Sequence, residues 1–389
     1  MSSYNFDQTI NRKNTSSLKW DFVEERYGAK DLLPMWVADM DFVSPDEVTK
    51  ALVKRAQHPV YGYTSTTDSV YDSVINWMKT QYNWGIQKEA ITFSAGVVAG
   101  FTAAILALSD PGDKVLIHTP VYTPFFDTIK NNDRELLQSP LRYIDETMQI
   151  NFEDFEEQLK QGVKLFLFCN PHNPGGKVWS KEDLIKIGEL CLKYNVVILS
   201  DEIHADLCLP GYTHYPIASL SPELAQMTVT FMAPSKTFNV AGIQASIIIT
   251  ENQKLLNKIQ TTQHKIGFHG LNLFAIEVIQ ASYNHGKVWL EELIQYIQQH
   301  VETVQMFIKK ELPEVKVMVP EASYLVWLDC RALGFSDSEL KSKLIEKGKI
   351  AISPGMMYGP GGEGFIRLNI GCTNDTLQEG LKRIKQALS

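Results

Sequence analysis

Lys236 is the side chain whose type and position most strongly suggest chemistry. It follows an apolar run at residues 228–232 that predicts a short buried strand, and Pro234 and Ser235 interrupt that strand. Parallel sheets bind ligands at the carboxyl ends of their strands. A lysine that is partly desolvated there loses some of its preference for the ammonium form, and a neutral amine can attack an aldehyde. The same lysine could equally be a surface residue that follows a strand.

Three further groups occupy positions of the same kind. Asp201 ends a second apolar run, and Tyr122 follows a third at residues 114–118. Small residues at 94–100 join a short strand to a long helix, and free backbone N–H groups at such a turn form an anion site. No Lys-Ser or Lys-Thr follows these glycines, so this is not a P-loop, and an ordinary tight turn is the alternative.

An amine, a carboxylate, an aromatic ring and an anion site together match the needs of pyridoxal 5′-phosphate. Its aldehyde requires the amine, its pyridine nitrogen requires a buried carboxylate to stay protonated, and its phosphate and ring require N–H groups and a flat partner. The sequence therefore predicts a site for this cofactor built on Lys236, Asp201 and Tyr122. Considered alone, a tyrosine such as Tyr122 is more often a packing residue than a functional one. A histidine such as His204 is more often a hydrogen-bonded residue of the core.

The elements that must position these residues alternate between strands and helices. Near-continuous apolar strands predict an α/β fold with a mixed, mostly parallel sheet covered by helices on both faces. Residues 252–312 are almost wholly helical in pattern, and a smaller C-terminal α/β domain follows. We expect an N-terminal segment (1–45) that joins the small lobe, a large cofactor-binding domain (46–285) and a small domain (286–389).

The N-terminal segment shows no clear periodicity and is expected to be irregular. Asp39 and Asp41, set between apolar residues, could be the edge of a metal or substrate site or only a solvated turn; a segment that lines a cleft is the preferred interpretation. A helix at 46–58 follows, with Ser44 as its expected cap and Pro45 at its first position.

The net charge, the apolar stretches and the cysteines of the chain argue against several classes of protein. A net charge of −8 disfavours nucleic acid and anionic membranes as partners. No stretch approaches the roughly 20 apolar residues of a membrane span, and the N-terminus lacks the features of a signal peptide. The five cysteines are scattered, without a Cys-x-x-Cys pair, which suits a reduced cytosol and gives no zinc site. We expect a cytoplasmic protein without a metal.

Nearly the whole chain resembles the fold-type-I pyridoxal-phosphate enzymes of the class I/II aminotransferase superfamily, which implies their transferase-like fold. The most specific matches are Asn170-Pro-His-Asn-Pro-Gly-Gly-Lys177, Ser200-Asp-Glu-Ile-His204 and Ser235-Lys-Thr-Phe-Asn-Val-Ala-Gly242. Within that superfamily the chain is most similar to the MalY/PatB branch, the cystathionine β-lyase-type C–S lyases. The segments that match this branch lie at residues 33–42, 60–64, 96–98, 170–179 and 365–370.

This resemblance implies a role for each matching residue around the cofactor ring. Lys236 would hold the cofactor covalently and move the α-proton of the substrate. Asp201 would hold the pyridinium, and Tyr122 would stack on the ring. Asn173 and His204 would face the phenolate oxygen of the ring, where family members often have a tyrosine in place of His204.

The resemblance also implies sites for the substrate and for the phosphate. Arg367 would clamp the α-carboxylate of an amino-acid substrate as a bidentate fork, beside Asn173 and the backbone of Ala38. A homodimer is implied, because Tyr63 would reach the phosphate of the neighbouring subunit. The other phosphate ligands would be the backbone of Gly96, Val97 and Val98 and the hydroxyl of Ser235.

The implied reaction is a β-elimination that cleaves the Cβ–S bond of cystathionine, cystine or an S-alkylcysteine. Its products are a thiol such as homocysteine, pyruvate and ammonia. An aminotransferase that exchanges an amino group with a 2-keto acid is an alternative, and a regulatory binding protein on the same scaffold is another. The family pattern is broken at Gln244, where aminotransferases usually place an arginine on the phosphate, and at Ala233, which replaces a serine. These two differences imply a weaker hold on the cofactor phosphate. An aminotransferase must retain a form of the cofactor that has no covalent bond to the lysine, so the weaker hold mildly favours the lyase.

Overall fold

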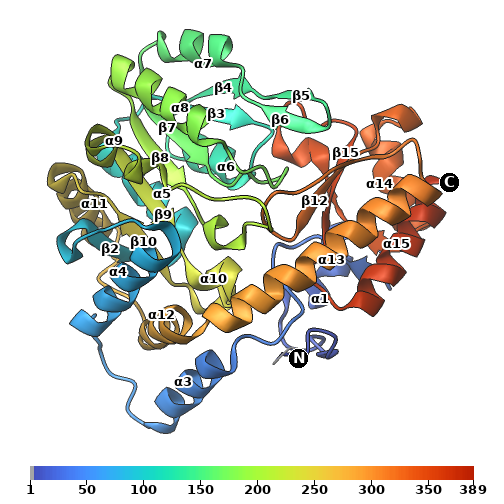
Figure 1. The fold of residues 1–389 in the computed structure, drawn as a ribbon, viewed down its shortest axis with the longest axis horizontal. Coiled ribbons are helices and arrows are strands. Elements are labelled where there is room, and N and C mark those ends of the chain that lie inside the picture. The colour runs from blue at the N-terminus through green and yellow to red at the C-terminus, as the bar shows by residue number, and fades with distance from the viewer. Residues whose placement is uncertain (1–3) are drawn as a thin grey trace.

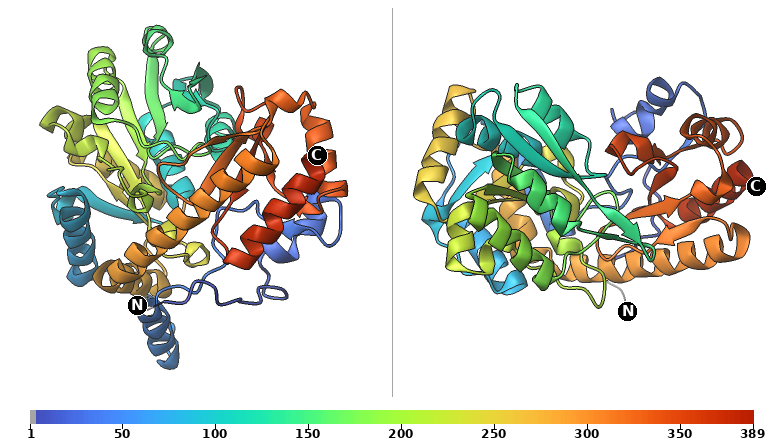
Figure 2. Two further views of the ribbon diagram at one scale, coloured as in Figure 1. Left: turned by 45° about the vertical axis from the view of Figure 1, so that its right-hand side comes forward. Right: turned by 90° about the horizontal axis from the view of Figure 1, so that it is seen from above.

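Two sheets form the cores of two lobes in the computed structural model, which describes residues 4–389. The lobes lie side by side when the molecule is seen from above (Figure 2). The long helix α13 (Lys287–Glu311) runs diagonally from the larger lobe to the smaller one (Figure 1). The expected domain boundary at 285/286 falls just before this helix, and like the boundary at residue 45 it stays a prediction.

The large sheet has seven strands, and only β10 runs antiparallel to its neighbours. All residues of β9 and β10 are buried, as expected of strands that helices cover on both faces. The predicted mixed, mostly parallel sheet is therefore confirmed. The order across the sheet is β2 (Ile91–Ser94), β10 (Ser246–Ile249), β9 (Thr228–Met232), β8 (Val197–Asp201), β7 (Val163–Cys169), β3 (Lys114–Thr119) and β4 (Glu135–Pro140).

Helices pack on both faces of this sheet (Figure 1). One face is covered by α5 (Val97–Leu108), α6 (Pro124–Lys130) and α11 (Gln253–Lys265). The other face is covered by α7 (Phe152–Leu159), α8 (Lys181–Tyr194) and α9 (Pro222–Met227). Near β2 and β10 the chain adds α3 (Asp46–Gln57), α4 (Asp68–Tyr82) and α12 (Leu273–His285).

The small lobe is built on a four-stranded antiparallel sheet, with α13, α14 (Asp337–Glu346) and α15 (Asn374–Leu388) in its core. The N-terminal segment contributes to this lobe, because β1 (Leu33–Pro34) pairs in parallel with β13 (Ile350–Ala351). The hairpin β5–β6 (Arg142–Ile144 and Thr147–Gln149) is a separate two-stranded sheet, and its Tyr143 and Met148 pack against side chains of the small sheet. The order of the small sheet is β11 (Lys316–Met318), β12 (Leu325–Asp329), β15 (Phe365–Asn369) and β14 (Ser353–Pro354).

Two expectations for the N-terminal segment are wrong. The segment is not wholly irregular, because α1 (Leu18–Asp21) and α2 (Val23–Tyr27) form within it. The N-cap of α3 is Pro45 rather than Ser44, and the Ser44 hydroxyl instead donates to the backbone oxygen of Asn239, 3.2 Å away. The serine thus fastens the segment to a turn of the large lobe.

Asp39 and Asp41 belong to an ion-pair network, which contradicts a solvated turn. Asp41 accepts hydrogen bonds from Lys19 and Arg12, each at 2.7 Å, and from the Trp20 indole at 2.8 Å. Arg12 also forms a two-point pair with Asp39, at 2.7 and 3.0 Å. The Lys19 side chain is only 1% exposed, so this network locks the segment from within.

Across residues 4–389 no three His, Cys, Asp or Glu side chains gather as a metal site. In the same part of the chain, no helix combines the length and the apolar character that crossing a bilayer requires.

Candidate active site

Four adjacent strands end at one edge of the large sheet, and a residue of the predicted site ends or follows each of them. Lys236 follows β9, Asp201 is the last residue of β8, Asn173 follows β7 and Tyr122 follows β3. Because these strands are parallel neighbours, their carboxyl ends present the four side chains together. The predicted placement at strand ends is therefore confirmed in the fold.

The amine of Lys236 lies inside the site. The residue sits in the one-turn helix α10 (Pro234–Thr237), and its Nζ donates to the backbone oxygen of Ala38 at 2.6 Å. Tyr324 Oη donates to the same oxygen at 3.1 Å. Desolvation is the largest influence on Lys236 and lowers its pKa from 10.5 to about 8; Asp39 and Asp201 oppose this shift, and Arg367 adds to it.

This lowered pKa predicts how Lys236 reacts in the cofactor-free protein. An amine attacks only when neutral, so its modification rate should rise with pH and level off above about 8 rather than above 10.5. The measurement is the pH dependence of labelling at Lys236 by a small amine-reactive reagent, followed by mass spectrometry. Lys254, which is exposed on α11, is the internal control for the reagent. Matching profiles for the two lysines would contradict the prediction.

The carboxyl group of Asp201 is buried beside this amine. The residue is 3% exposed, and its Oδ1 accepts a hydrogen bond from the Ile203 backbone at 3.2 Å. Burial raises the pKa of Asp201 to about 7, and the Ile203 N–H and Lys236 only partly oppose that shift. Pairing with a cationic ring nitrogen would stabilise the ionised form of this buried carboxyl group, because it would replace the hydration that burial removes.

His204 and Tyr122 complete the wall around this pair. Burial lowers the pKa of His204 to about 3, so its ring is neutral, and its Nδ1 is buried without a hydrogen-bond partner. Burial raises the pKa of Tyr122 to about 12, with Asp201 adding to the rise. A buried polar nitrogen without a partner is costly unless a ligand satisfies it. The unpartnered nitrogen of His204 therefore has the property expected of a ligand contact.

Arg367 enters the site from β15 of the small lobe. One terminal nitrogen, Nη1, donates to Asn173 Oδ1 at 2.9 Å, and Nη2 donates to the Trp36 backbone oxygen at 2.8 Å. The guanidinium lies over the Tyr358 ring, 5.1 Å from its centroid. Its Nε is buried and has no partner. A cation held in this way can still receive an anion, as the substrate role requires.

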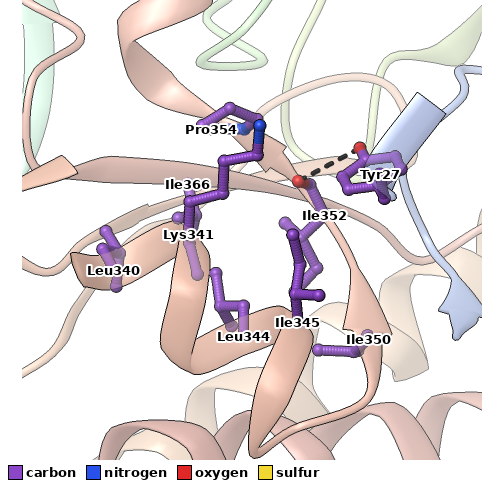
Figure 3. Close-up of a pocket in the computed structure, with 9 residues that line it drawn as sticks. All are labelled: Tyr27, Leu340, Lys341, Leu344, Ile345, Ile350, Ile352, Pro354 and Ile366. Atoms are coloured by element: carbon purple, nitrogen blue, oxygen red, sulfur yellow. Dashed lines mark hydrogen bonds between the residues drawn. The ribbon is translucent and has the colours of Figure 1, made fainter. Parts of the chain in front are cut away.

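Tyr27 supports this arrangement from behind Trp36. The two rings meet edge to face, with their centroids 5.5 Å apart. Figure 3 shows the hydrogen bond that Tyr27 Oη donates to the Ile352 backbone oxygen at 3.2 Å. The small cavity around Tyr27, with a volume of about 10 Å³, is lined mainly by aliphatic side chains and is too small for a ligand. It belongs to the packing of the small lobe.

Residues 36–42 form a backbone strap that side chains of both lobes hold. From the small lobe, Asn369 Nδ2 donates to the backbone oxygens of Val37 and Asp39. From the large lobe, Asn239 donates to the oxygens of Met40 and Phe42 and accepts from the Met40 N–H, at 2.8–2.9 Å. Sequence reasoning did not find Asn239, Asn369 or Tyr324 as part of the site. A polar residue inside the motif that contains Lys236 was the available signal for Asn239.

The start of α5 has the features of an anion site. Gly96 is its N-cap with φ of +150°, no side chain caps the helix, and a Cβ at Gly96 would meet open space. The N–H groups of the first helical turn have no partner within the helix. Ser235 lies at the start of α10, at the same edge of the sheet.

Two residues lie outside this cluster. Tyr63 is fully exposed on the loop between α3 and α4, so the structure does not bring it to the site of its own chain. Gln244 is also exposed, in a left-handed conformation at the end of a short 3₁₀ helix.

These observations fit pyridoxal 5′-phosphate. The site offers an amine of lowered pKa, a buried carboxyl group, an anion-binding helix start, and polar nitrogens of His204 and Arg367 that lack partners. The donor set matches the aldehyde, the ring nitrogen, the phosphate and the anionic oxygens that this cofactor and an amino-acid substrate carry.

Comparisons with known proteins agree with this fit. The family model "Aminotransferase class I and II" matches residues 30–384. The chain is 49% identical to the cystathionine beta-lyase PatB of Bacillus subtilis (strain 168) over 386 residues, which cover 99% of the chain and 100% of the relative. It is 31% identical to the protein MalY of Escherichia coli (strain K12), with 99% of each chain covered.

Solved structures show the same likeness. Cystalysin of Treponema denticola, which contains a pyridoxal 5′-phosphate cofactor, superposes with a TM-score of 0.96 at 36% identity and covers 99% of this chain and 98% of its own. The pyridoxal-phosphate-bound C–S lyase of Staphylococcus hominis superposes with a TM-score of 0.92 at 33% identity, with 99% of each chain covered.

Proposed function

The chain belongs to the aminotransferase class I and II family, and from this membership we propose that it cleaves cystathionine or a related cysteine thioether by β-elimination. It is a pyridoxal-phosphate-dependent carbon–sulfur lyase, as its relatives are. The observation that carries the proposal is the pair of Lys236 and Asp201 at neighbouring strand ends, with Arg367 facing them from the small lobe.

The mechanism follows from what these side chains can do. When bound, the cofactor supplies an electron sink for the pair of electrons that the departing α-proton leaves behind. Lys236, whose pKa near 8 gives a substantial neutral fraction, takes that proton from Cα as general base. Arg367 holds the substrate carboxylate and fixes the direction in which Cα faces the lysine. Departure of the thiol, with addition of water, yields pyruvate and ammonia.

The cofactor would be held by the residues gathered at the sheet edge. Asp201 would keep the pyridine nitrogen protonated, and Tyr122 would lie against the ring. Asn173 and His204 would face its phenolate oxygen, for which the free Nδ1 of His204 is suited. The phosphate would bind at the anion site formed by the N–H groups of Gly96, Val97 and Val98 and the hydroxyl of Ser235.

A homodimer with Tyr63 contributed in trans is the second part of the proposal. Tyr63, Tyr61 and Val60 are exposed together on a loop, and that loop and α3 project away from the body of the molecule (Figure 1). Such a patch suits contact with a second copy. The solution mass should be twice the 44.0 kDa of the chain. A fully active monomer would contradict the proposed homodimer.

The experiment that tests the reaction separates elimination from amino-group exchange. The purified protein is given cystathionine, and pyruvate and free thiol are measured with and without an added 2-keto acid. Elimination predicts equal amounts of pyruvate and thiol in the absence of a keto acid. Net amino transfer to the keto acid without release of thiol would show an aminotransferase instead.

Replacing Arg367 with lysine should raise KM by about 100-fold and change kcat much less. Lysine keeps the positive charge but loses the planar fork and the bonds to Asn173 and Trp36. The matched control is Arg331→Lys, since Arg331 also makes a two-point pair, with Asp329, but is half exposed outside the site. Equal effects of the two changes on KM would refute the substrate role of Arg367.

A further inference from the structure

Asp206 lies two residues after His204 in the chain and takes no part in the reaction described above. It belongs to the short 3₁₀ helix Ala205–Leu207, immediately after His204. Its Oδ1 accepts hydrogen bonds from the Trp77 indole at 2.9 Å and from Tyr82 Oη, both on α4. Its Oδ2 accepts from the Thr237 hydroxyl at 2.7 Å. Three donors thus converge on this one carboxylate.

The hydrogen bond to Thr237 connects two segments, after β8 and after β9, whose relative position the site depends on. Asp201, His204 and Asp206 leave the end of β8, whereas Lys236 and Thr237 leave the end of β9. The helix that carries Lys236 has only four residues, and no side chain caps its N-terminus. A single helical turn is not stable on its own, so its position depends on tertiary contacts. The Asp206–Thr237 bond is such a contact, adjacent in sequence to the reactive lysine.

We propose that Asp206 is a positioning residue, which sets the distance between Lys236 and the segment that carries Asp201 and His204. It acts through Thr237, while Trp77 and Tyr82 hold its other oxygen against α4. This inference rests on the proposed function, because it assigns Lys236 and Asp201 to the two ends of one cofactor. Desolvation raises the pKa of Asp206 and its three donors oppose the rise, as expected of a carboxylate held by hydrogen bonds.

A purely structural role would have a different signature. In that case Asp206 would serve only to fasten α4 to the large lobe, and the bonds to Tyr82 and to Thr237 would matter equally. The Trp77 ring already packs on Tyr283 and Phe238, at 5.0 and 5.8 Å, so α4 has other attachments. The two oxygens of Asp206 therefore allow the two roles to be tested separately.

Three variants make that test: Thr237→Val, which removes the hydroxyl and keeps the shape; Thr237→Ser, which restores the hydroxyl; and Tyr82→Phe, which removes a bond on the α4 side only. For each we would measure the dissociation constant of pyridoxal 5′-phosphate by absorbance, kcat and KM with cystathionine, and the pH midpoint of Lys236 labelling. Thr237→Val should weaken cofactor binding about 10-fold and lower kcat about 10- to 100-fold, with KM changed less than about threefold.

Thr237→Ser should stay within about threefold of the unmodified protein in every readout, and Tyr82→Phe should lower the melting temperature without changing cofactor affinity. Equal effects of Thr237→Val and Tyr82→Phe, or no effect of Thr237→Val, would overturn the positioning role. If Thr237→Val does not fold, Thr237→Ala is measured against the same criteria. If the unmodified protein binds the cofactor but releases no pyruvate, the proposed reaction fails, and the affinity and labelling data still decide the role of Asp206.

Discussion

Lys236→Ala is expected to lower kcat by about 10⁴-fold and to remove the absorbance band of the covalent link between the lysine and the cofactor. The change removes both the covalent attachment and the base that takes the α-proton. No other amine of the described chain is hydrogen-bonded at the same position, where Nζ meets the Ala38 oxygen at 2.6 Å. The measurement is a visible spectrum of the purified protein together with pyruvate release from cystathionine.

Two controls accompany this prediction. Lys236→Arg keeps a positive charge near Ala38 but cannot act as a neutral base, so its activity should be as low as that of the alanine variant. Lys254→Ala, on the exposed face of α11, should leave both readouts unchanged. Pyruvate release by Lys236→Ala within tenfold of the unmodified protein would show that another group carries the reaction.

Asp201→Asn is expected to lower kcat by about 10³-fold, the second largest effect. Asparagine keeps the size of the side chain and can still accept from the Ile203 N–H. It cannot keep a ring nitrogen protonated, because it carries no negative charge, and the electron sink is lost. The measurement is kcat with cystathionine, alongside the cofactor spectrum recorded over a range of pH.

The neighbouring buried carboxylate provides the control. Glu202 is 1% exposed and bonds to His214 and to the Ser200 hydroxyl, both at 2.8 Å, rather than entering the site. Glu202→Gln should therefore reduce stability by about 1–3 kcal/mol and change kcat far less than Asp201→Asn. Similar losses of kcat in both variants would indicate a general disturbance of the strand end rather than a specific role for Asp201.

The sequence was most informative where strands are buried. The apolar runs at residues 228–232 and 114–118 located β9 and β3 closely, because strands covered on both faces leave little ambiguity of pattern. It was least informative for α1, α2 and α6, which have four to seven residues and depend on tertiary contacts. The edge strand β4 was also missed, because only one of its residues is fully buried.

The same division applies to the candidate site. Lys236, Asp201 and Tyr122 could be placed because strand ends gather at one edge, whereas the role of Asn173 was implied by the resemblance to the family. The grip of Asn239 and Asn369 on residues 36–42 could not be predicted, since it joins positions about 200 and 330 residues apart through side-chain amides. The place of Tyr63 could not be tested within one chain, because its proposed partner is a second subunit.

The strap at residues 36–42 contacts both the residue proposed to bind the substrate and the reactive lysine. Within three consecutive residues its backbone accepts the guanidinium of Arg367 at Trp36 and the amine of Lys236 at Ala38. In the cofactor-free protein, a carboxylate that competes for the guanidinium would loosen one anchor of this strip, two residues from the oxygen that accepts the Lys236 amine. The residue proposed to bind the substrate carboxylate and the reactive lysine thus contact the same short piece of main chain.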